Sequence, residues 1–121
     1  MGGADVFRSY LEAFTSGDIE GAVELITDDF SFAGPILQSE GKEAFLAGSQ
    51  AAQAMAKGYR MLRQFEDGDE VVSIYEFKLG PPATPGSVLM AEWNTVREGK
   101  LASARLVFDT AQFMALMPQQ D

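Results

Sequence analysis

The spacing of apolar residues changes once along this chain, and the change constrains the fold more than any other feature. Up to residue 55, apart from a short stretch at residues 30–33, apolar side chains recur every three or four positions, as on a helix. From Tyr59 onward they alternate, as on a strand. Helices followed by a run of antiparallel strands is the order of an α+β domain. Four consecutive strands are too few to close a barrel, so we expect the sheet to curl over the helices.

Three helices are predicted before this change. The first begins at the potential N-cap Asp5 and extends to about residue 15. The second follows a hinge at residues 16–18 and ends before Asp28, and the third covers residues 42–55. A short strand is predicted at residues 30–33, between the second and third helices.

Four longer strands are predicted at residues 59–65, 71–79, 88–97 and 101–108. Tight turns are expected at residues 66–69 and 98–99, and a proline-rich stretch joins the second strand to the third. Thr110 is a potential cap for a final helical turn. Residues 1–121 contain no repeat or linker, so we expect a single domain.

The chain has 18 acidic and 9 basic residues, a formal net charge of -9. A surface of this sign repels phosphate backbones and anionic lipids, so we expect neither a nucleic acid nor a membrane as partner. No apolar run approaches the roughly 20 residues that span a bilayer. The N-terminus lacks the basic and apolar segments of a secretion signal, so a cytoplasmic location is expected.

Cysteine and histidine are both absent from the chain. Their absence removes thiol nucleophiles, Ser-His and Cys-His arrangements and the usual ligands of catalytic zinc. The Asp-x-Asp spacing of Asp67 and Asp69 belongs to a predicted tight turn and not to a hard-cation loop, so we expect no metal and no other cofactor. Any acid–base chemistry would use Asp, Glu, Tyr or Lys.

Three stretches resemble the nuclear-transport-factor-like (NTF2-like, SnoaL-like) superfamily, which includes ketosteroid isomerases, limonene epoxide hydrolases and polyketide cyclases. They are residues 9–18, residues 28–35 and residues 97–113. The resemblance implies a cystatin-like cone, in which three N-terminal helices pack in a curved, mixed or antiparallel sheet around a central pocket. Because this fold hosts many functions, it implies a fold more strongly than a reaction.

The epoxide hydrolase site is mostly missing from the positions that the resemblance assigns to it. The family's catalytic tyrosine is replaced here by Phe32, its asparagine by Gly34, its arginine by Ile74 and its water-activating aspartate by Leu106. Only Glu76 keeps a carboxylate. The resemblance therefore implies that epoxide hydrolysis is not retained.

The ketosteroid isomerase site is partly present. That family stabilises an oxyanion with a tyrosine of the first helix and a neutral carboxylic acid. The resemblance places Tyr10 at the tyrosine and Glu92 at the acid. The position of the proton-transferring base falls at Gly34, which has no side chain.

A carboxylate pair is predicted from the strands that flank the proline-rich stretch. If they pair symmetrically about Thr84, Glu76 faces Glu92 with Cβ atoms about 4.5–5.5 Å apart. Two buried carboxylates at that distance share a proton and can act as acid and base. Glu92, Glu76 and Tyr10 are therefore the candidate catalytic residues.

Two assignments of the buried face remain open for these strands. The pattern of side-chain types predicts that the apolar face is buried and that the glutamates are exposed to water. The apolar face carries Tyr75, Phe77, Leu89 and Trp93. The resemblance instead turns the glutamate face into the cone and exposes the aromatic face, where an apolar patch favours a homodimer. The pocket would then be lined by Phe14, Phe32, Gly34, Ile74, Met90, Asn94, Leu106 and Phe108.

Three functions are compatible with the sequence. The chain could be an enzyme that acts on an apolar molecule, such as a terpenoid, steroid-like or polyketide compound, by proton transfer or isomerisation. It could instead bind an apolar small molecule without catalysis, or serve as a dimerisation module with a filled pocket. The missing base favours the second and third functions.

Overall fold

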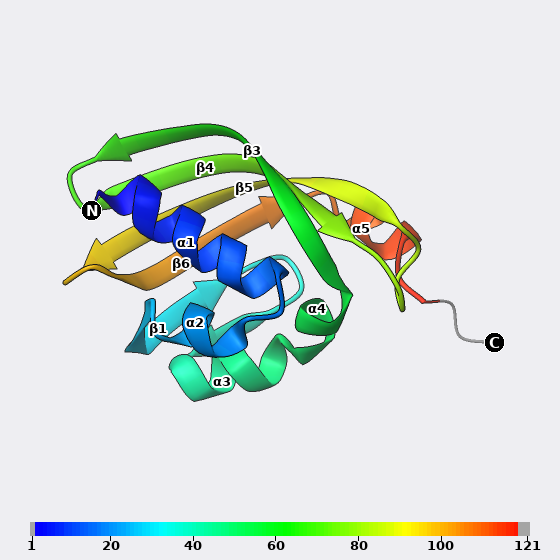
Figure 1. The fold of residues 1–121 in the computed structure, drawn as a ribbon, viewed down its shortest axis with the longest axis horizontal. Coiled ribbons are helices and arrows are strands. Elements are labelled where there is room, and N and C mark those ends of the chain that lie inside the picture. The colour runs from blue at the N-terminus through cyan, green and yellow to red at the C-terminus, as the bar shows by residue number, and fades with distance from the viewer. Residues whose placement is uncertain (1, 119–121) are drawn as a thin grey trace.

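The computed structural model describes residues 2–118, which form one curved six-stranded sheet with helices against its concave face (Figure 1). The strand order is β2-β1-β6-β5-β4-β3. The α+β cone expected from the sequence is confirmed. In chain order the elements are α1 (Gly3–Thr15), α2 (Ile19–Val23), β1 (Ile26–Ala33), β2 (Gln38–Glu40), α3 (Lys42–Gly48), α4 (Gln50–Met55), β3 (Ala56–Asp67), β4 (Glu70–Leu79), β5 (Gly86–Arg97), β6 (Lys100–Phe108) and α5 (Thr110–Ala115).

Helix α1 lies along the concave face of the sheet (Figure 1). Its Phe7 is fully buried and packs against Tyr75 of β4, with ring centroids 5.7 Å apart. The predicted N-cap is wrong, because Gly2 occupies the cap position and the Ala4 amide donates to the Glu66 carboxylate of β3. Asp5 instead forms an ion pair with Arg8.

The sheet is larger than the predicted four-strand meander. β1 starts at Ile26, earlier than predicted, and runs parallel to β6, so the sheet is mixed. β2 lies in a stretch without a predicted strand and pairs antiparallel with β1. Ile26 follows the apolar residues of α2 at the spacing of a helix, but it is the first residue of strand β1 and its side chain is buried there. Over so few residues, apolar spacing cannot distinguish the end of a helix from the start of a strand.

The helices are shorter and more numerous than predicted. The predicted third helix is divided at Ser49 into α3 and α4. The predicted final turn is α5, which is capped by the side chain of Asp109 and not by Thr110. The longest helix, α1, has 13 residues, and no helix within residues 2–118 is long and apolar enough to cross a membrane.

The pairing register of β4 and β5 decides which side chains enter the cone. Glu76 is opposite Leu89, and Ile74 is opposite Ala91. The predicted pairing of Glu76 with Glu92, and of Ile74 with Asn94, is therefore wrong by three residues. Because the shift is an odd number of residues, β4 presents the opposite face from the one that the predicted register requires.

Each of the two assignments of the buried face is correct for one strand. On β5 the resemblance implied the right face, since Met90, Glu92 and Asn94 are at most 5% exposed. On β4 the pattern of side-chain types indicated the right face, since Tyr75 and Phe77 are buried. The structure thus buries aromatic residues of β4 beside polar residues of β5.

Candidate functional site

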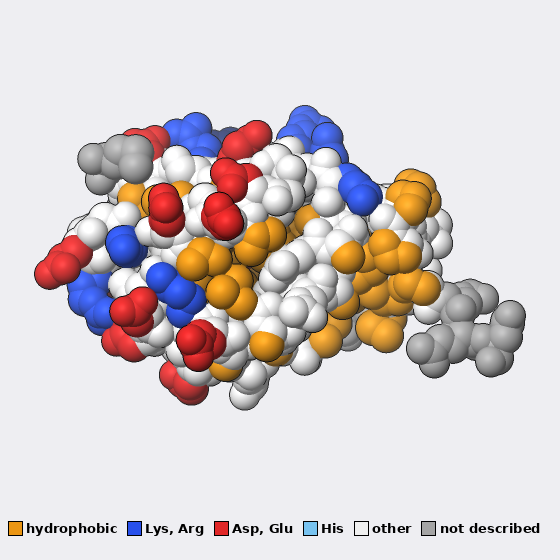
Figure 2. All heavy atoms as spheres, turned by 60° about the horizontal axis from the view of Figure 1, so that its bottom comes forward, with side chains coloured by type: hydrophobic (Ala, Val, Ile, Leu, Met, Phe, Trp, Pro, Cys, Tyr) orange, Lys and Arg blue, Asp and Glu red, His pale blue; other side chains and the backbone are white. Residues whose placement is uncertain are grey.

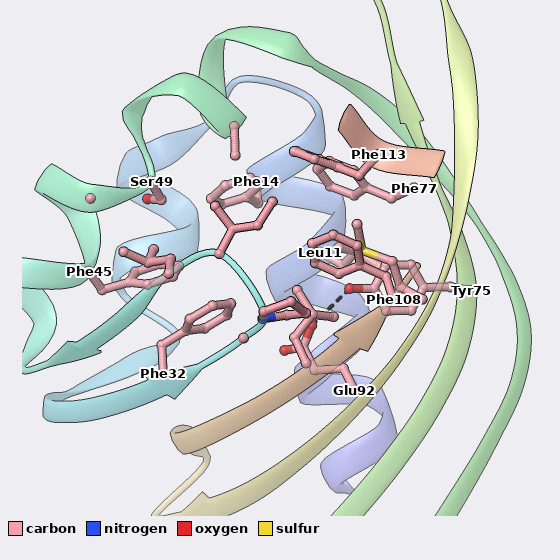
Figure 3. A pocket seen from close by; sticks show the side chains of 18 of the residues that line it. Leu11, Phe14, Phe32, Phe45, Ser49, Tyr75, Phe77, Glu92, Phe108 and Phe113 are labelled. Carbon is pink, nitrogen blue, oxygen red and sulfur yellow. Dashed lines mark hydrogen bonds between the residues drawn. The ribbon is translucent and has the colours of Figure 1, made fainter. Parts of the chain in front are cut away.

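A cavity of about 150 Å³ lies inside the cone, between the N-terminal helices and the sheet (Figure 3). Ile36, which is 55% exposed, and Phe113 of α5 belong to its wall, so the cavity reaches the surface beside the β1–β2 connection. Apolar side chains also gather on the surface toward the end of the molecule that carries α5 (Figure 2). The wall contains eight aromatic residues: Tyr10, Phe14, Phe32, Phe45, Tyr75, Phe77, Phe108 and Phe113.

Most of the predicted lining residues do line this cavity. They are Phe14, Phe32, Gly34, Met90, Leu106 and Phe108. Ile74 does not, because the register turns it to the outer face of the sheet. Asn94 is fully buried but lies behind Glu92, where it also contacts the carbonyl of Ser103.

Glu92 is the charged residue of the cavity wall; the other described lining residues carry no charge. It is 5% exposed, and both of its carboxyl oxygens accept hydrogen bonds. Oε1 accepts from the Tyr75 hydroxyl at 2.8 Å, the contact drawn in Figure 3, and Oε2 accepts from Asn94 Nδ2 at 3.1 Å. Glu92 is therefore held in one orientation at the edge of an apolar cavity.

Burial raises the pKa of the Glu92 carboxyl, because it penalises the charged form. The hydrogen bonds from Asn94 and Tyr75 favour the carboxylate and lower that pKa only in part. Within residues 2–118, no three carboxylates come together in a group that could hold a metal ion.

Tyr10 and Tyr75 contribute two phenols near this carboxyl. Both are buried, and burial raises the pKa of each well above the ordinary tyrosine value, with a further rise from the negative charge of Glu92. The phenols therefore stay protonated and can donate hydrogen bonds. Together, one carboxyl and two phenols can bind a polar group of a ligand or exchange a proton with it.

Glu76 does not belong to this site. It lies on the outer face of the sheet, where its carboxylate is 3.6 Å from Arg60 Nη1. The carboxylate pair predicted from the sequence is therefore absent. The polar neighbour that Glu92 does have on β4, Tyr75, was not among the candidate site residues. The apolar alternation along β4 was the signal that could have found it.

The outer face of the sheet carries an apolar patch, which we call the outer patch. It consists of Phe65, Val72, Leu89, Trp93 and Val107, which are 37–62% exposed. Leu89 and Trp93 were expected there, but Tyr75 and Phe77 face the cavity because of the β4–β5 register. The indole of Trp93 also donates to Glu70 at 2.9 Å.

Solved structures with the same fold support these assignments of architecture. A protein of Kribbella flavida DSM 17836 has 24% sequence identity and a TM-score of 0.80, covering 93% of this chain and 90% of its own. TerC, crystallised with polyporic acid, has 20% identity and a TM-score of 0.79 over 94% of this chain and 96% of its own. A protein of Catenulispora acidiphila DSM 44928 with a ketosteroid isomerase-like fold, in complex with trimethylamine, has 17% identity and a TM-score of 0.79 over 93% of each chain.

No curated protein matches the chain. The model of the SnoaL-like domain family, in contrast, matches residues 7–104. That span runs from α1 into β6 and includes Tyr10, Tyr75 and Glu92. The chain therefore belongs to the SnoaL-like domain family.

Proposed function

We propose that the chain binds a small, mainly apolar organic molecule in the cavity, with one polar group of the ligand facing the carboxyl of Glu92. The observation that carries this proposal is the wall itself: one buried carboxyl, held by Tyr75 and Asn94, among aromatic and aliphatic side chains. Binding pockets for small molecules have this composition, in which apolar surface supplies affinity and a few polar groups fix orientation.

The size of the cavity limits the ligand. A cavity of about 150 Å³ is comparable to an engineered protein cavity that takes up benzene. A monocyclic or short branched compound fits this space, whereas a steroid-like or polyketide compound requires the wall to move. Proteins with the same fold have been crystallised with ligands of different sizes, TerC with polyporic acid and the Catenulispora protein with trimethylamine.

Binding accounts for the site better than catalysis by a carboxylate pair. Glu76 lies on the other face of the sheet, so Glu92 is the one carboxyl among the described lining residues. A single carboxyl can exchange a proton with a ligand. The isomerase arrangement needs a separate base that moves the proton, in addition to the groups that stabilise the oxyanion. Gly34, which stands at the position of that base, has no side chain.

The test uses benzene as a probe and two substitutions on α4. Ala52 lines the cavity, whereas Ala51 is exposed on the same helix, so Ala52→Phe fills the cavity and Ala51→Phe is the matched control. We expect benzene to shift the NMR signals of Met90 and Leu106 saturably in the parent and in the control. The filled variant should bind about tenfold more weakly or not at all. Absence of saturable shifts in the parent overturns the proposal.

We also propose a second copy of the chain as the partner of the outer patch. Five of the eight large apolar side chains that are exposed within residues 2–118 lie on this face. Exposed apolar patches of this kind mark interfaces, and a two-fold axis buries the same patch on both copies. The face also carries Arg60, Arg63 and Arg105 together with Glu70 and Glu76, so a symmetric pairing can place opposite charges together.

Sedimentation at tens of micromolar tests this partner. The parent should have twice the mass of the 13.1 kDa chain, and Val107→Glu on the outer patch should return it to the single-chain mass. Met114→Glu is the matched control, because Met114 is equally apolar and 57% exposed but belongs to α5. A parent with the single-chain mass overturns this second proposal and leaves ligand binding untouched.

A further inference from the structure

The negative charge of the cavity has no counter-ion among the described lining residues. None of the lining residues that the structure describes is Lys or Arg, and the groups that contact the Glu92 carboxyl, Tyr75 and Asn94, are neutral donors. Both donate to the carboxyl oxygens, an arrangement that favours the ionised form. An ionised carboxyl buried without a cation is costly. When Glu92 is ionised, its charge therefore has no balancing cation among the described lining residues.

The wall around this carboxyl is suited to a positive charge. Tyr10 of α1 and Tyr75 of β4 lie close enough to Glu92 for its charge to raise the pKa of both phenols. Phe14, Phe77 and Phe108 continue the aromatic wall from there. Aromatic rings attract cations through their electron-rich faces, and the attraction is strongest where water is excluded. The alkyl groups of an organic cation would be buried against the same rings.

We propose that the ligand is a small organic cation, an alkylated amine or ammonium compound about the size of benzene, with the Glu92 carboxylate as its counter-ion. This inference rests on the proposed function and specifies the chemical class of its ligand. An anionic ligand is disfavoured because Glu92 repels it. A neutral carbonyl ligand could accept a hydrogen bond from Tyr10, but it would leave the Glu92 carboxylate without a counter-ion.

Two probes of equal shape test the inference. Tetramethylammonium and tert-butanol have the same number of heavy atoms and the same branching, but only the first is charged. Calorimetric titration of the parent should give an affinity for tetramethylammonium at least about tenfold higher than for tert-butanol. Glu92→Gln should remove this preference while tert-butanol still binds. Glu70→Gln, on the outer face, is the control and should preserve the preference.

The pH dependence gives a second readout that requires no variant. Protonation of Glu92 removes the counter-ion, so the affinity for tetramethylammonium should be higher at about pH 8 than at about pH 5. The titratable groups that face Glu92 are Tyr10 from α1 and Tyr75 from β4, and both stay protonated over this range. The affinity for tert-butanol should not rise in the same way.

The outcomes separate this inference from the proposed function. If tert-butanol or benzene binds and tetramethylammonium binds no better than tert-butanol, the ligand class is wrong and the proposed function stands. If none of the three probes binds, both are overturned. An affinity for tetramethylammonium that falls with increasing pH also overturns the inference, because the cation would then not depend on the carboxylate.

Discussion

Tyr75 reaches Glu92 diagonally across the β4–β5 pair. Its hydroxyl donates to Glu92 Oε1 at 2.8 Å, although the residue directly opposite Tyr75 is Met90. Diagonal neighbours in an antiparallel pair lie within reach of aromatic side chains when they share a face of the sheet. The contact therefore depends on a register that places odd-numbered residues of β4 on the same face as even-numbered residues of β5.

Tyr75→Phe should raise the pKa of Glu92 further, because the variant loses a hydrogen bond that favours the carboxylate. It should also lower the free energy of unfolding by about 1–3 kcal/mol. Carboxyl-carbon NMR titration and chemical denaturation measure the two effects. Tyr59→Phe is the control, because that phenol lies beside Glu12 and should leave the pKa of Glu92 unchanged. An unchanged pKa of Glu92 in Tyr75→Phe would contradict the assigned contact.

Glu92→Gln should change how stability depends on pH. The pKa of Glu92 is raised in the folded state, so its ionisation costs stability as pH rises above the unfolded value and through the folded value. Below the unfolded pKa the carboxyl is neutral in both states and carries no such cost. The unfolding free energy of the variant, relative to the parent, should therefore rise between about pH 4 and about pH 8.

The matched control for this experiment is Glu76→Gln, which removes a carboxylate from the outer face of the same sheet. Denaturation curves of parent, variant and control at each pH give the comparison. If Glu92→Gln and Glu76→Gln show the same pH profile, burial of Glu92 does not govern the stability of the fold.

Cysteine pairs can check the β4–β5 register directly, since the chain has no cysteine of its own. Glu76→Cys combined with Leu89→Cys places two thiols on opposed residues, within the Cα separation that a disulfide allows. Glu76→Cys combined with Glu92→Cys separates them by about 10 Å along the strand and points them to opposite faces. The first pair should oxidise and the second should not, as thiol counting by mass spectrometry would show. Efficient oxidation of the second pair would instead support the symmetric register, in which Glu76 is opposite Glu92.

Trp93, the single tryptophan, lies on the outer face and is 44% exposed, so its fluorescence reports on this face and not on the cavity. If the outer patch is a dimer interface, dilution should shift the emission to longer wavelength as the indole becomes hydrated. Val107→Glu should show the long-wavelength emission at every concentration, whereas saturation with benzene should leave the emission unchanged. Emission that is independent of concentration and of Val107→Glu would contradict the interface.

Alternating apolar residues allowed the long strands and their turns to be predicted from the sequence. Glu98 and Gly99 both have positive φ, 53° and 76°, as the predicted tight turn requires. The alternation also showed which residues of one strand share a face, as Tyr75 and Phe77 do. The absence of histidine and cysteine by itself limited the possible acid–base chemistry to carboxyl, phenol and amine groups.

Tertiary structure alone decided which of those faces meet. A period of two identifies the residues on a face but not the partner strand or its register, and a shift of one residue reverses every side chain. For that reason the alternating pattern could not show that Glu76 and Glu92 lie on opposite faces of the sheet. The parallel pairing of β1 with β6 brings Phe32 beside Ala104 from a distant part of the chain, and no local signal encodes it. The site around Glu92 exists because these long-range pairings bury one carboxyl among aromatic residues of α1, β1 and β4.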